Sequence, residues 1–213
     1  MNKLNKFYRN EKTIERALKK VNDEYRPFDP GLYLYRKIMG VSFEKKFSSE
    51  FIELAYVTLI AWNMNSRGAK LQEYKKFKRS IISNQKIFRC LHRYKLNKIS
   101  DVNVEKKMKK LFNNLDLVLN GKPPLVTFAK TLHFFLPNLV CPIDRKYTLQ
   151  YFYGNTNVPV NKDKQFDKFK EIQKAYGSLS SKVSLSKYKN KKWNTTIPKI
   201  ADNITIGYLK GKK

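Results

Sequence analysis

The chain has 213 residues, of which 41% are hydrophobic and 14% aromatic, with only 8 glycines and 8 prolines. This composition excludes a disordered tail, a collagen-like protein and a disulfide-stapled miniprotein. Forty-five lysines and arginines stand against 17 aspartates and glutamates, which gives a formal net charge of +28. A surface this positive requires a polyanion, and nucleic acid is the commonest one. An AT-biased genome would also enrich lysine, but it would not deplete the acidic residues.

The cysteines and histidines limit the metal chemistry that is open to the chain. Cys90 and Cys141 form no CxxC pair, and His92 and His133 are the only histidines. The sequence therefore lacks the ligands of a zinc finger, a four-cysteine iron–sulfur cluster or a zinc deaminase, and we expect no metal and no cofactor. We also expect no signal peptide, and no apolar run in the sequence is long enough to span a bilayer. We expect an intracellular, cytoplasmic protein that associates with the nucleoid.

Helical periodicity runs through almost the whole chain, and strand signals are few. In chain order, the pattern predicts helices from Asp29-Pro30 to Met39, from Ser48 or Ser49 to Trp62, over 104–118 with Gly121 and Pro123 after it, over 125–136, from Asp144 to Gly154, over 161–176 and over 196–209. The helix that ends at Trp62 is apolar on nearly every face, so we expect it at the centre of the core. Residues 157–160 read as a loop.

The predicted fold class is therefore all-α. We expect one compact helical domain over residues 1–213, or two helical lobes (about 1–50 plus 140–213, and 51–139) with a basic cleft between them. Two segments carry much of the charge: 66–110 has 15 lysines and arginines against three acids, and 181–213 has nine lysines against Asp202. Aromatic residues are interleaved with both, which favours a nucleic-acid surface over a solvated basic face whose aromatics are only core.

The acidic residues are few enough to inspect one by one. Most stand beside lysine or arginine, whereas four lie in apolar surroundings: Glu53, Asp116, Asp144 and Asp202. The chain has no Walker loop, no GxGxxG turn and no GxSxG elbow. It also lacks the carboxylate arrangement typical of a two-metal nuclease, so metal-dependent cleavage stays only as an alternative.

The most informative segment runs from Pro124 to Thr148. It places Lys130-Thr131 in an apolar helix and Pro142-Ile143-Asp144-Arg145 at the start of the next one. This order resembles the catalytic segment of the helix-hairpin-helix (HhH-GPD) DNA glycosylase superfamily, in which a lysine follows the hairpin and an aspartate opens a helix. The segment from Trp62 to Lys70 is similar to the part of those enzymes that forms the base-extruding wedge and the pocket wall. The glycine turn that precedes the lysine in that superfamily is replaced here by Pro123-Pro124.

The resemblance implies a compact glycosylase-like fold with a basic DNA-binding cleft. It also implies that Asp144 stabilises the cationic sugar and activates water, while Lys130 is a Schiff-base nucleophile that would add lyase activity at abasic sites. A flipped base would then lie in a pocket formed by Trp62, Asn63, Asn65, Tyr147 and His133. The DNA backbone would be held by Arg67, Lys70, Arg145 and Lys146.

Each of these residues also has a purely structural interpretation. Asp144 is a good helix N-cap, and Lys130 could extend along the surface to solvent. His133 could be a hydrogen-bonded core residue, Trp62 a core residue, and Asn63 or Asn65 a helix cap.

We expect a monomeric DNA glycosylase that acts on double-stranded DNA and excises a damaged or modified base, leaving an abasic site, in DNA repair or in antiviral defence. The alternatives are a non-catalytic DNA-binding protein with a glycosylase-like fold and a metal-dependent nuclease.

Overall fold

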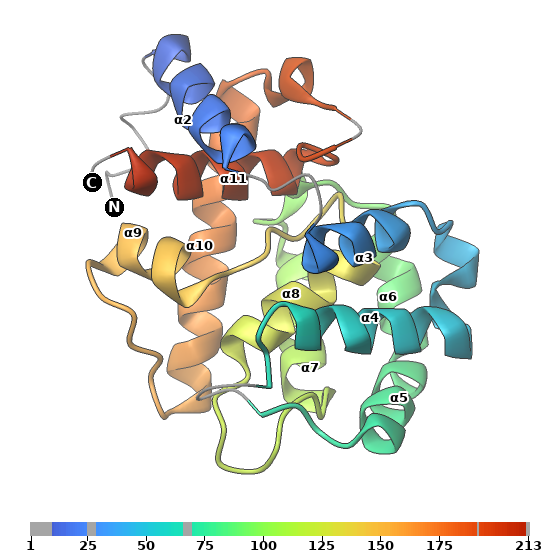
Figure 1. Ribbon diagram of the computed structural model, residues 1–213. Coiled ribbons are helices and arrows are strands. Elements are labelled where there is room, and N and C mark those ends of the chain that lie inside the picture. Colours follow the sequence, from blue (N-terminus) through green and yellow to red (C-terminus); the bar gives the residue numbers. More distant parts are fainter. Residues whose placement is uncertain (1–9, 25–28, 66–69, 191, 212–213) are drawn as a thin grey trace.

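A computed structural model describes residues 10–24, 29–65, 70–190 and 192–211. Within these ranges the chain forms ten α-helices and no strand, apart from a single antiparallel bridge between Leu71 and Val118. The predicted all-α fold class is confirmed (Figure 1). No helix in the described ranges is long and apolar enough to cross a membrane. The glycosylase-like topology and the basic cleft stay predictions.

The helices follow one another through short connections. They are α2 (Glu11–Asp23), α3 (Pro30–Met39), α4 (Ser49–Ala61), α5 (Tyr74–Ser83), α6 (Gln85–His92), α7 (Val102–Asn114), α8 (Leu125–Phe135), α9 (Gln150–Tyr153), α10 (Lys162–Lys182) and α11 (Ile197–Lys210). Short helical turns lie between them: η1 (Phe43–Phe47), η2 (Leu96–Lys98), the π-helical η3 (Arg145–Leu149) and η4 (Leu185–Tyr188).

Several helices begin where the sequence predicts, because a polar side chain caps the first free backbone amides. Asp29 accepts a hydrogen bond from the amide of Leu32 at 2.8 Å, and Pro30 follows at the first helical position. Ser48 caps α4 and Thr196 caps α11 in the same way. Residues 157–160 lie outside any helix, as expected.

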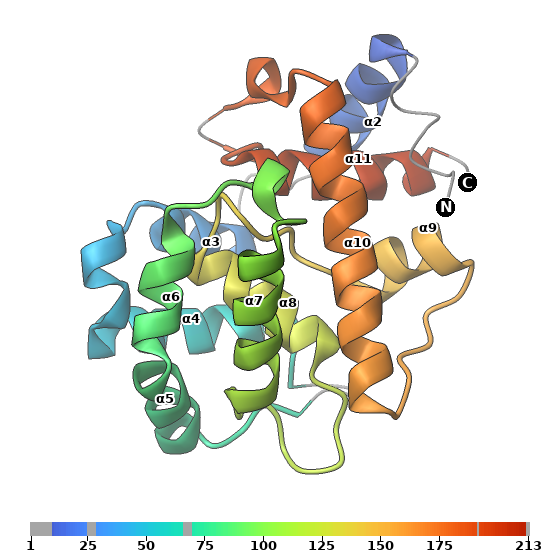
Figure 2. The ribbon, with the colours of Figure 1, turned by 180° about the vertical axis from the view of Figure 1, so that it is seen from behind.

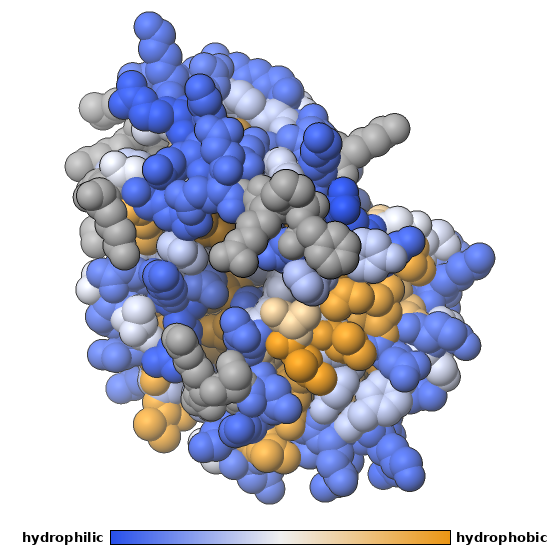
Figure 3. Space-filling model, in the orientation of Figure 1, coloured by the Kyte–Doolittle hydropathy of each residue, from blue (hydrophilic) through white to orange (hydrophobic). Residues whose placement is uncertain are grey.

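The helix at the centre of the core is α8, and the prediction that α4 would lie there is wrong. Every residue of α8 is buried, whereas Val57 and Ile60 of α4 are 43% and 42% exposed. The apolar outer side of α4 belongs to a hydrophobic area that Figure 3 shows over α3 and α4. The hydrophobic periodicity of the sequence could not show which of the two helices is wholly buried, because α4 and α8 are both apolar on nearly all sides.

The helix α7 is shorter than predicted and ends at Asn114 instead of near residue 118. The chain turns extended at Leu115 and pairs with a distant segment, with the amide of Leu119 donating to the carbonyl of Lys70 at 2.9 Å. Helical spacing of the apolar residues continued past this point, but the non-local pairing determines the end of the helix.

The first and last helices of the described residues cross at a close approach. Gly207 of α11 lies so near Ala17 of α2 that a Cβ atom at position 207 would overlap the Ala17 carbonyl group. The two helices lie side by side in both views (Figures 1 and 2). Glycine is required here because the contact is with backbone, which cannot move aside as a side chain would.

One cluster of buried side chains runs through the described residues from Ile14 to Ile204, with α8 inside it. In space, α2 packs against α11, and α3 packs against α4. The single domain over residues 1–213 and the alternative of two lobes both stay predictions.

Candidate active site

The side chain of Lys130 does not reach to solvent. It projects from the buried helix α8, and the residue is only 6% exposed. Its Nζ lies 3.8 Å from Oδ2 of Asp144 and 5.4 Å from the ring centroid of Trp62. The structure therefore brings together three of the residues selected from the sequence, which are the C-cap of α4, a residue of α8 and the N-cap of η3.

The two carboxylate oxygens of Asp144 have different partners. Oδ1 accepts hydrogen bonds from the amides of Lys146 at 2.7 Å and Tyr147 at 3.1 Å, so Asp144 is the N-cap of η3. Oδ2 faces Lys130. The side chain is 36% exposed, so the carboxylate has solvent on one side and a buried ammonium group on the other.

A second ion pair lies at the same aromatic ring. Nζ of Lys199 is 2.7 Å from Oδ2 of Asp202 on α11, and their side chains are 8% and 4% exposed. Nζ of Lys199 also lies 5.9 Å from the ring centroid of Trp62. The sequence analysis singled out Asp202 for its apolar surroundings but missed Lys199. The signal that could have found it is an i,i+3 lysine–aspartate pair inside an otherwise apolar helix.

The burial of these groups shifts their protonation. Burial lowers the pKa of Lys130, the carboxylates of Asp144 and Asp202 oppose that shift, and the ammonium of Lys199 adds to it. For Asp202, burial raises the pKa of the carboxyl group, and Lys199 beside it works in the opposite direction. Lys130 therefore gives up its proton more easily than an exposed lysine does.

Trp62 is fixed in place by its neighbours. Its indole Nε1 donates to the carbonyl of Gly31 at 3.3 Å, and its ring centroid is 5.4 Å from that of Tyr35 and 5.0 Å from that of Phe134. A Cβ atom on Gly31 would come within 3.0 Å of the indole ring. The half-buried ring thus has one defined position next to both ion pairs.

Asn63 ends α4 in a Schellman motif. It has a positive φ of 59°. Its amide donates to the carbonyl of Ile60 at 2.9 Å, and the amide of Met64 donates to the carbonyl of Leu59 at 2.9 Å. Asparagine is the residue that accepts this left-handed conformation best after glycine. The capping interpretation accounts for its backbone, while its exposed side chain leaves the predicted role in a base pocket open.

His133 lies entirely inside the core. Its Nε2 is 2.8 Å from Oη of Tyr35, and its Nδ1 is 2.7 Å from the carbonyl oxygen of Val140. Burial lowers the pKa of the imidazole to about 3, so the ring is neutral near pH 7. These contacts are those of a hydrogen-bonded core residue, and the predicted role of His133 in a base pocket stays a prediction.

The other described residues selected from the sequence make separate contacts. Tyr147 is half-buried, and the ammonium groups of Lys146 and Lys210 lie 5.4 Å and 5.8 Å from its ring centroid. Arg145 is exposed, and its Nε donates to the carbonyl of Thr156 at 3.0 Å. Exposed Lys70 donates to the carbonyl of exposed Asn65 at 3.3 Å. The predicted backbone contact Arg67 lies outside the described residues.

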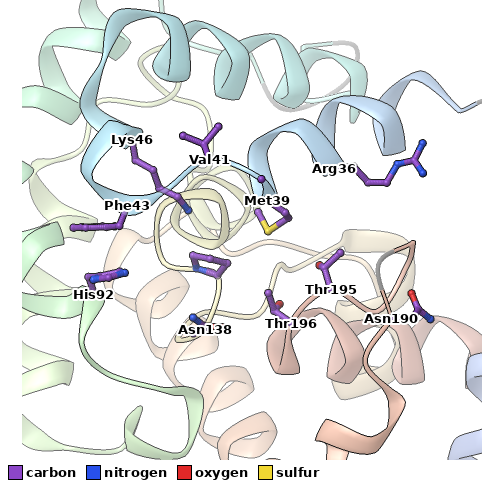
Figure 4. Close-up of a pocket in the computed structure, with 12 residues that line it drawn as sticks. Arg36, Met39, Val41, Phe43, Lys46, His92, Asn138, Asn190, Thr195 and Thr196 are labelled. Atoms are coloured by element: carbon purple, nitrogen blue, oxygen red, sulfur yellow. The ribbon is translucent and has the colours of Figure 1, made fainter.

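A cavity of about 490 Å³ lies at the end of α8, between α3, η1 and the residues before α11 (Figure 4). Lys46 lines it and donates to the carbonyls of Phe134 at 2.5 Å and Phe135 at 3.5 Å. Burial lowers the pKa of this lysine to about 7. None of the residues predicted from the sequence lines this cavity.

The site can supply a carboxylate at a helix N-terminus, a buried amine and an aromatic ring beside them. In the part of the chain that the structure describes, no group of three histidine, cysteine, aspartate or glutamate side chains could hold a metal ion. The chain was compared with protein-family models, with curated proteins and with solved structures, and none of the three comparisons gives a match.

Proposed function

We propose that the protein is a monomeric DNA glycosylase that excises a damaged or modified base from double-stranded DNA. The observation that carries this proposal is the pairing of Lys130 with Asp144, where a partly exposed carboxylate at a helix N-terminus meets a buried amine. The resemblance of the surrounding segment to the HhH-GPD superfamily supports the same activity, as does the net charge of +28.

Asp144 would act on the sugar. When the N-glycosidic bond breaks, its electron pair leaves with the base and the deoxyribose gains oxocarbenium character. A carboxylate next to the sugar stabilises this charge and can take a proton from the attacking water, whose oxygen then binds C1′. The exposed side of Asp144 is where sugar and water would approach, since Oδ1 is already used for the helix cap.

Lys130 would act after the base has left. An unprotonated amine can attack C1′ of the aldehyde form of an abasic site, and loss of water gives an imine. Loss of a proton from C2′ then expels the 3′ phosphate with its electron pair and cuts the strand. The lowered pKa of Lys130 favours the amine form that this step needs.

The experiment uses Asp144→Asn and a matched control. Asp101 caps α7 in the same way as Asp144 caps η3. Oδ1 of Asp101 accepts hydrogen bonds from the amide of Asn103 at 2.8 Å and from the amide of Val104 at 3.2 Å. Purified variants are incubated in EDTA with duplexes that carry uracil or oxidised, alkylated, hydroxymethylated or glucosylated bases. Strand breaks are read after hot alkali.

We expect alkali-dependent breaks at one base, lost in Asp144→Asn and kept in Asp101→Asn. Breaks without alkali would indicate lyase activity at Lys130. Equal activity in both variants contradicts the assigned role of Asp144.

A non-catalytic DNA-binding protein is the second candidate. The observation in its favour is the N-cap at Asp144, because two amide bonds alone give this aspartate a structural purpose. In that case no substrate is cut while DNA binding is unchanged in Asp144→Asn. Cleavage that requires Mg²⁺ and stops with EDTA would instead support a nuclease.

A further inference from the structure

We propose that the cavity at the end of α8 is a binding site for a small phosphate ester, such as a sugar phosphate or a mononucleotide. The cavity has a volume of about 490 Å³, and neither Lys130 nor Asp144 lines it. Pockets that bind small organic molecules usually measure roughly 300–1,000 Å³. This site is therefore separate from the candidate active site, and its ligand does not depend on the proposed function.

Among the described residues, Lys46 is the buried lysine that has no carboxylate partner. The three buried lysines are Lys46, Lys130 and Lys199, which are 3%, 6% and 7% exposed. Nζ of Lys130 lies 3.8 Å from Asp144, and Nζ of Lys199 lies 2.7 Å from Asp202. None of the ion pairs within the described ranges includes Lys46. Buried charges in proteins are normally paired, so an anion from solution would complete this position.

The carbonyl groups at the end of α8 satisfy only part of the charge of Lys46. Its Nζ donates to the carbonyls of Phe134 at 2.5 Å and Phe135 at 3.5 Å, and the end of a helix carries only about half an elementary charge. An ammonium group has three N–H donors, so these two carbonyls leave one donor for a ligand. Burial lowers the pKa of Lys46 to about 7, and a bound anion would favour its charged form.

The walls of the cavity carry positive charge and hydrogen-bond donors but no carboxylate. Arg36 and His92 line it together with Lys46, and none of the described residues that line it is acidic. Figure 4 shows the side chain of Lys46 extending from η1 into the space between the lining residues. A phosphate monoester has up to about two negative charges and three acceptor oxygens near pH 7, so it can meet several donors at once.

The rest of the lining suits an organic body attached to the phosphate. Thr195 and Asn138 supply a hydroxyl and an amide group, which can bind the oxygens of a sugar. Met39, Val41 and Phe43 supply apolar contacts on the same cavity. Apolar walls with a few polar groups are typical of sites for small organic ligands. Inorganic phosphate alone would leave these walls uncovered, so we expect an ester to bind more tightly.

Methionine methyl groups can report where a ligand binds. The chain has four methionines, Met1, Met39, Met64 and Met108. Met39 lines the cavity, Met64 lies two residues after Trp62 of the candidate active site, and Met108 is buried in α7. The protein with isotopically labelled methionine methyl groups is titrated with AMP, ribose 5-phosphate, adenosine and inorganic phosphate, and NMR spectra are recorded. Met39→Leu identifies the Met39 signal.

We expect AMP or ribose 5-phosphate to shift the Met39 signal until it saturates, with the Met108 signal unchanged. The titrations are made at about 0.15 M salt, where interactions between exposed charges are screened beyond about 8 Å. Adenosine has no phosphate and inorganic phosphate has no organic body, so each should bind about tenfold more weakly than the better ester, or weaker still.

Two pairs of variants test the charge of the cavity. Asn138→Asp places a negative charge on its wall, whereas Asn103→Asp places the same charge at the exposed start of α7, outside the cavity. Lys46→Met removes the buried ammonium, and Lys45→Met removes that of its exposed neighbour. We expect the first variant of each pair to lose affinity for the ester by about tenfold or more, and each control to keep it. Asn138→Asp keeps the test valid if Lys46→Met does not fold, because Lys46 also holds the end of α8.

Three results would overturn this assignment of the cavity. They are no shift of the Met39 signal with either ester, equal binding of adenosine or inorganic phosphate, and equal affinity of Asn138→Asp and Asn103→Asp. A shift confined to Met64 would also reject it, because the ester would then bind at the candidate active site. None of these measurements uses base excision, so their failure leaves the proposed function standing, and loss of the proposed function leaves this site standing.

Discussion

Nδ1 of His133 lies 2.7 Å from the carbonyl oxygen of Val140. A carbonyl oxygen only accepts hydrogen bonds, so Nδ1 carries the proton of the neutral ring, and Nε2 accepts from Oη of Tyr35. The tyrosine oxygen can in turn accept from Oγ1 of Thr195, 3.0 Å away. This chain of bonds ties α8 to α3 and to the segment before α11, and it includes the imidazole in its neutral form.

The first prediction follows from that neutrality. The pKa of His133 is about 3 in the folded protein and about 6.5 when exposed, so the unfolded chain binds more protons between these values. The free energy of unfolding should therefore fall as pH drops through this window, by up to about 1.4 kcal/mol per pH unit. Urea unfolding at pH 7, 5.5 and 4.5 measures it. His133→Gln should flatten the dependence.

His92→Gln is the control for this prediction. The ring of His92 is partly exposed on α6. Burial and the charge of Lys46 lower the pKa of His92, but this shift is smaller than the shift of His133. His92→Gln should therefore change the slope of the free energy of unfolding against pH less than His133→Gln does. Equal slopes in the wild type and His133→Gln would contradict the buried neutral state of His133.

The second prediction concerns the crossing of α2 and α11. Gly207→Ala places a methyl group against the carbonyl of Ala17, so the helices must separate. We expect a loss of about 1–3 kcal/mol in the free energy of unfolding. Gly211→Ala is the matched control, because its added Cβ would meet the nearest atom at 3.4 Å, an ordinary contact distance. Equal stability of the two variants would argue against this crossing.

The third prediction separates backbone contacts from base contacts. Lys146 is exposed at the first turn of η3, next to the proposed site. If it binds a phosphate, Lys146→Gln should weaken DNA binding for all sequences and reduce the slope of log K against log salt by about 0.9. Fluorescence anisotropy at several salt concentrations measures this slope. Lys19→Gln, a change of an exposed lysine on α2, should leave it unchanged.

The fourth prediction tests the side chain of Asn63 independently of its backbone. Asn63→Gly keeps the left-handed conformation at no steric cost, whereas Asn63→Ala should destabilise the protein by about 1 kcal/mol. If the amide contacts the flipped base, both variants lose base excision, although Asn63→Gly is more stable than Asn63→Ala. Base release and melting temperature are measured on the same preparations. Full activity of Asn63→Gly would limit Asn63 to its role as a cap.

The sequence predicted the features that depend on neighbouring residues. Asp29-Pro30, Ser48 and Asp144 each stand at a helix start because a short polar side chain reaches the next free amides. The segment with Lys130 and Asp144 was found in the same local way. No pattern in the sequence predicted that their side chains lie 3.8 Å apart.

Features that depend on distant residues were not predicted. The end of α7 is set by the pairing of the segment after it with residues near Leu71. The exposure of α4 results from the packing of the other helices around α8 instead of around α4. Lys199 escaped notice because a lysine on a helix is normally solvated, and only the packing of α11 beside Trp62 makes it part of the site.

The crossing at Gly207 brings together segments of the chain that are synthesised at different times. Lys199 and Asp202 lie on α11, which is made after Trp62, Lys130 and Asp144. A nascent chain that has completed α10 contains both residues of the first ion pair but neither residue of the second. The helix α11, the last of the described helices, packs against α2, the first of them. The four charged side chains can therefore gather beside Trp62 only after α11 has been synthesised.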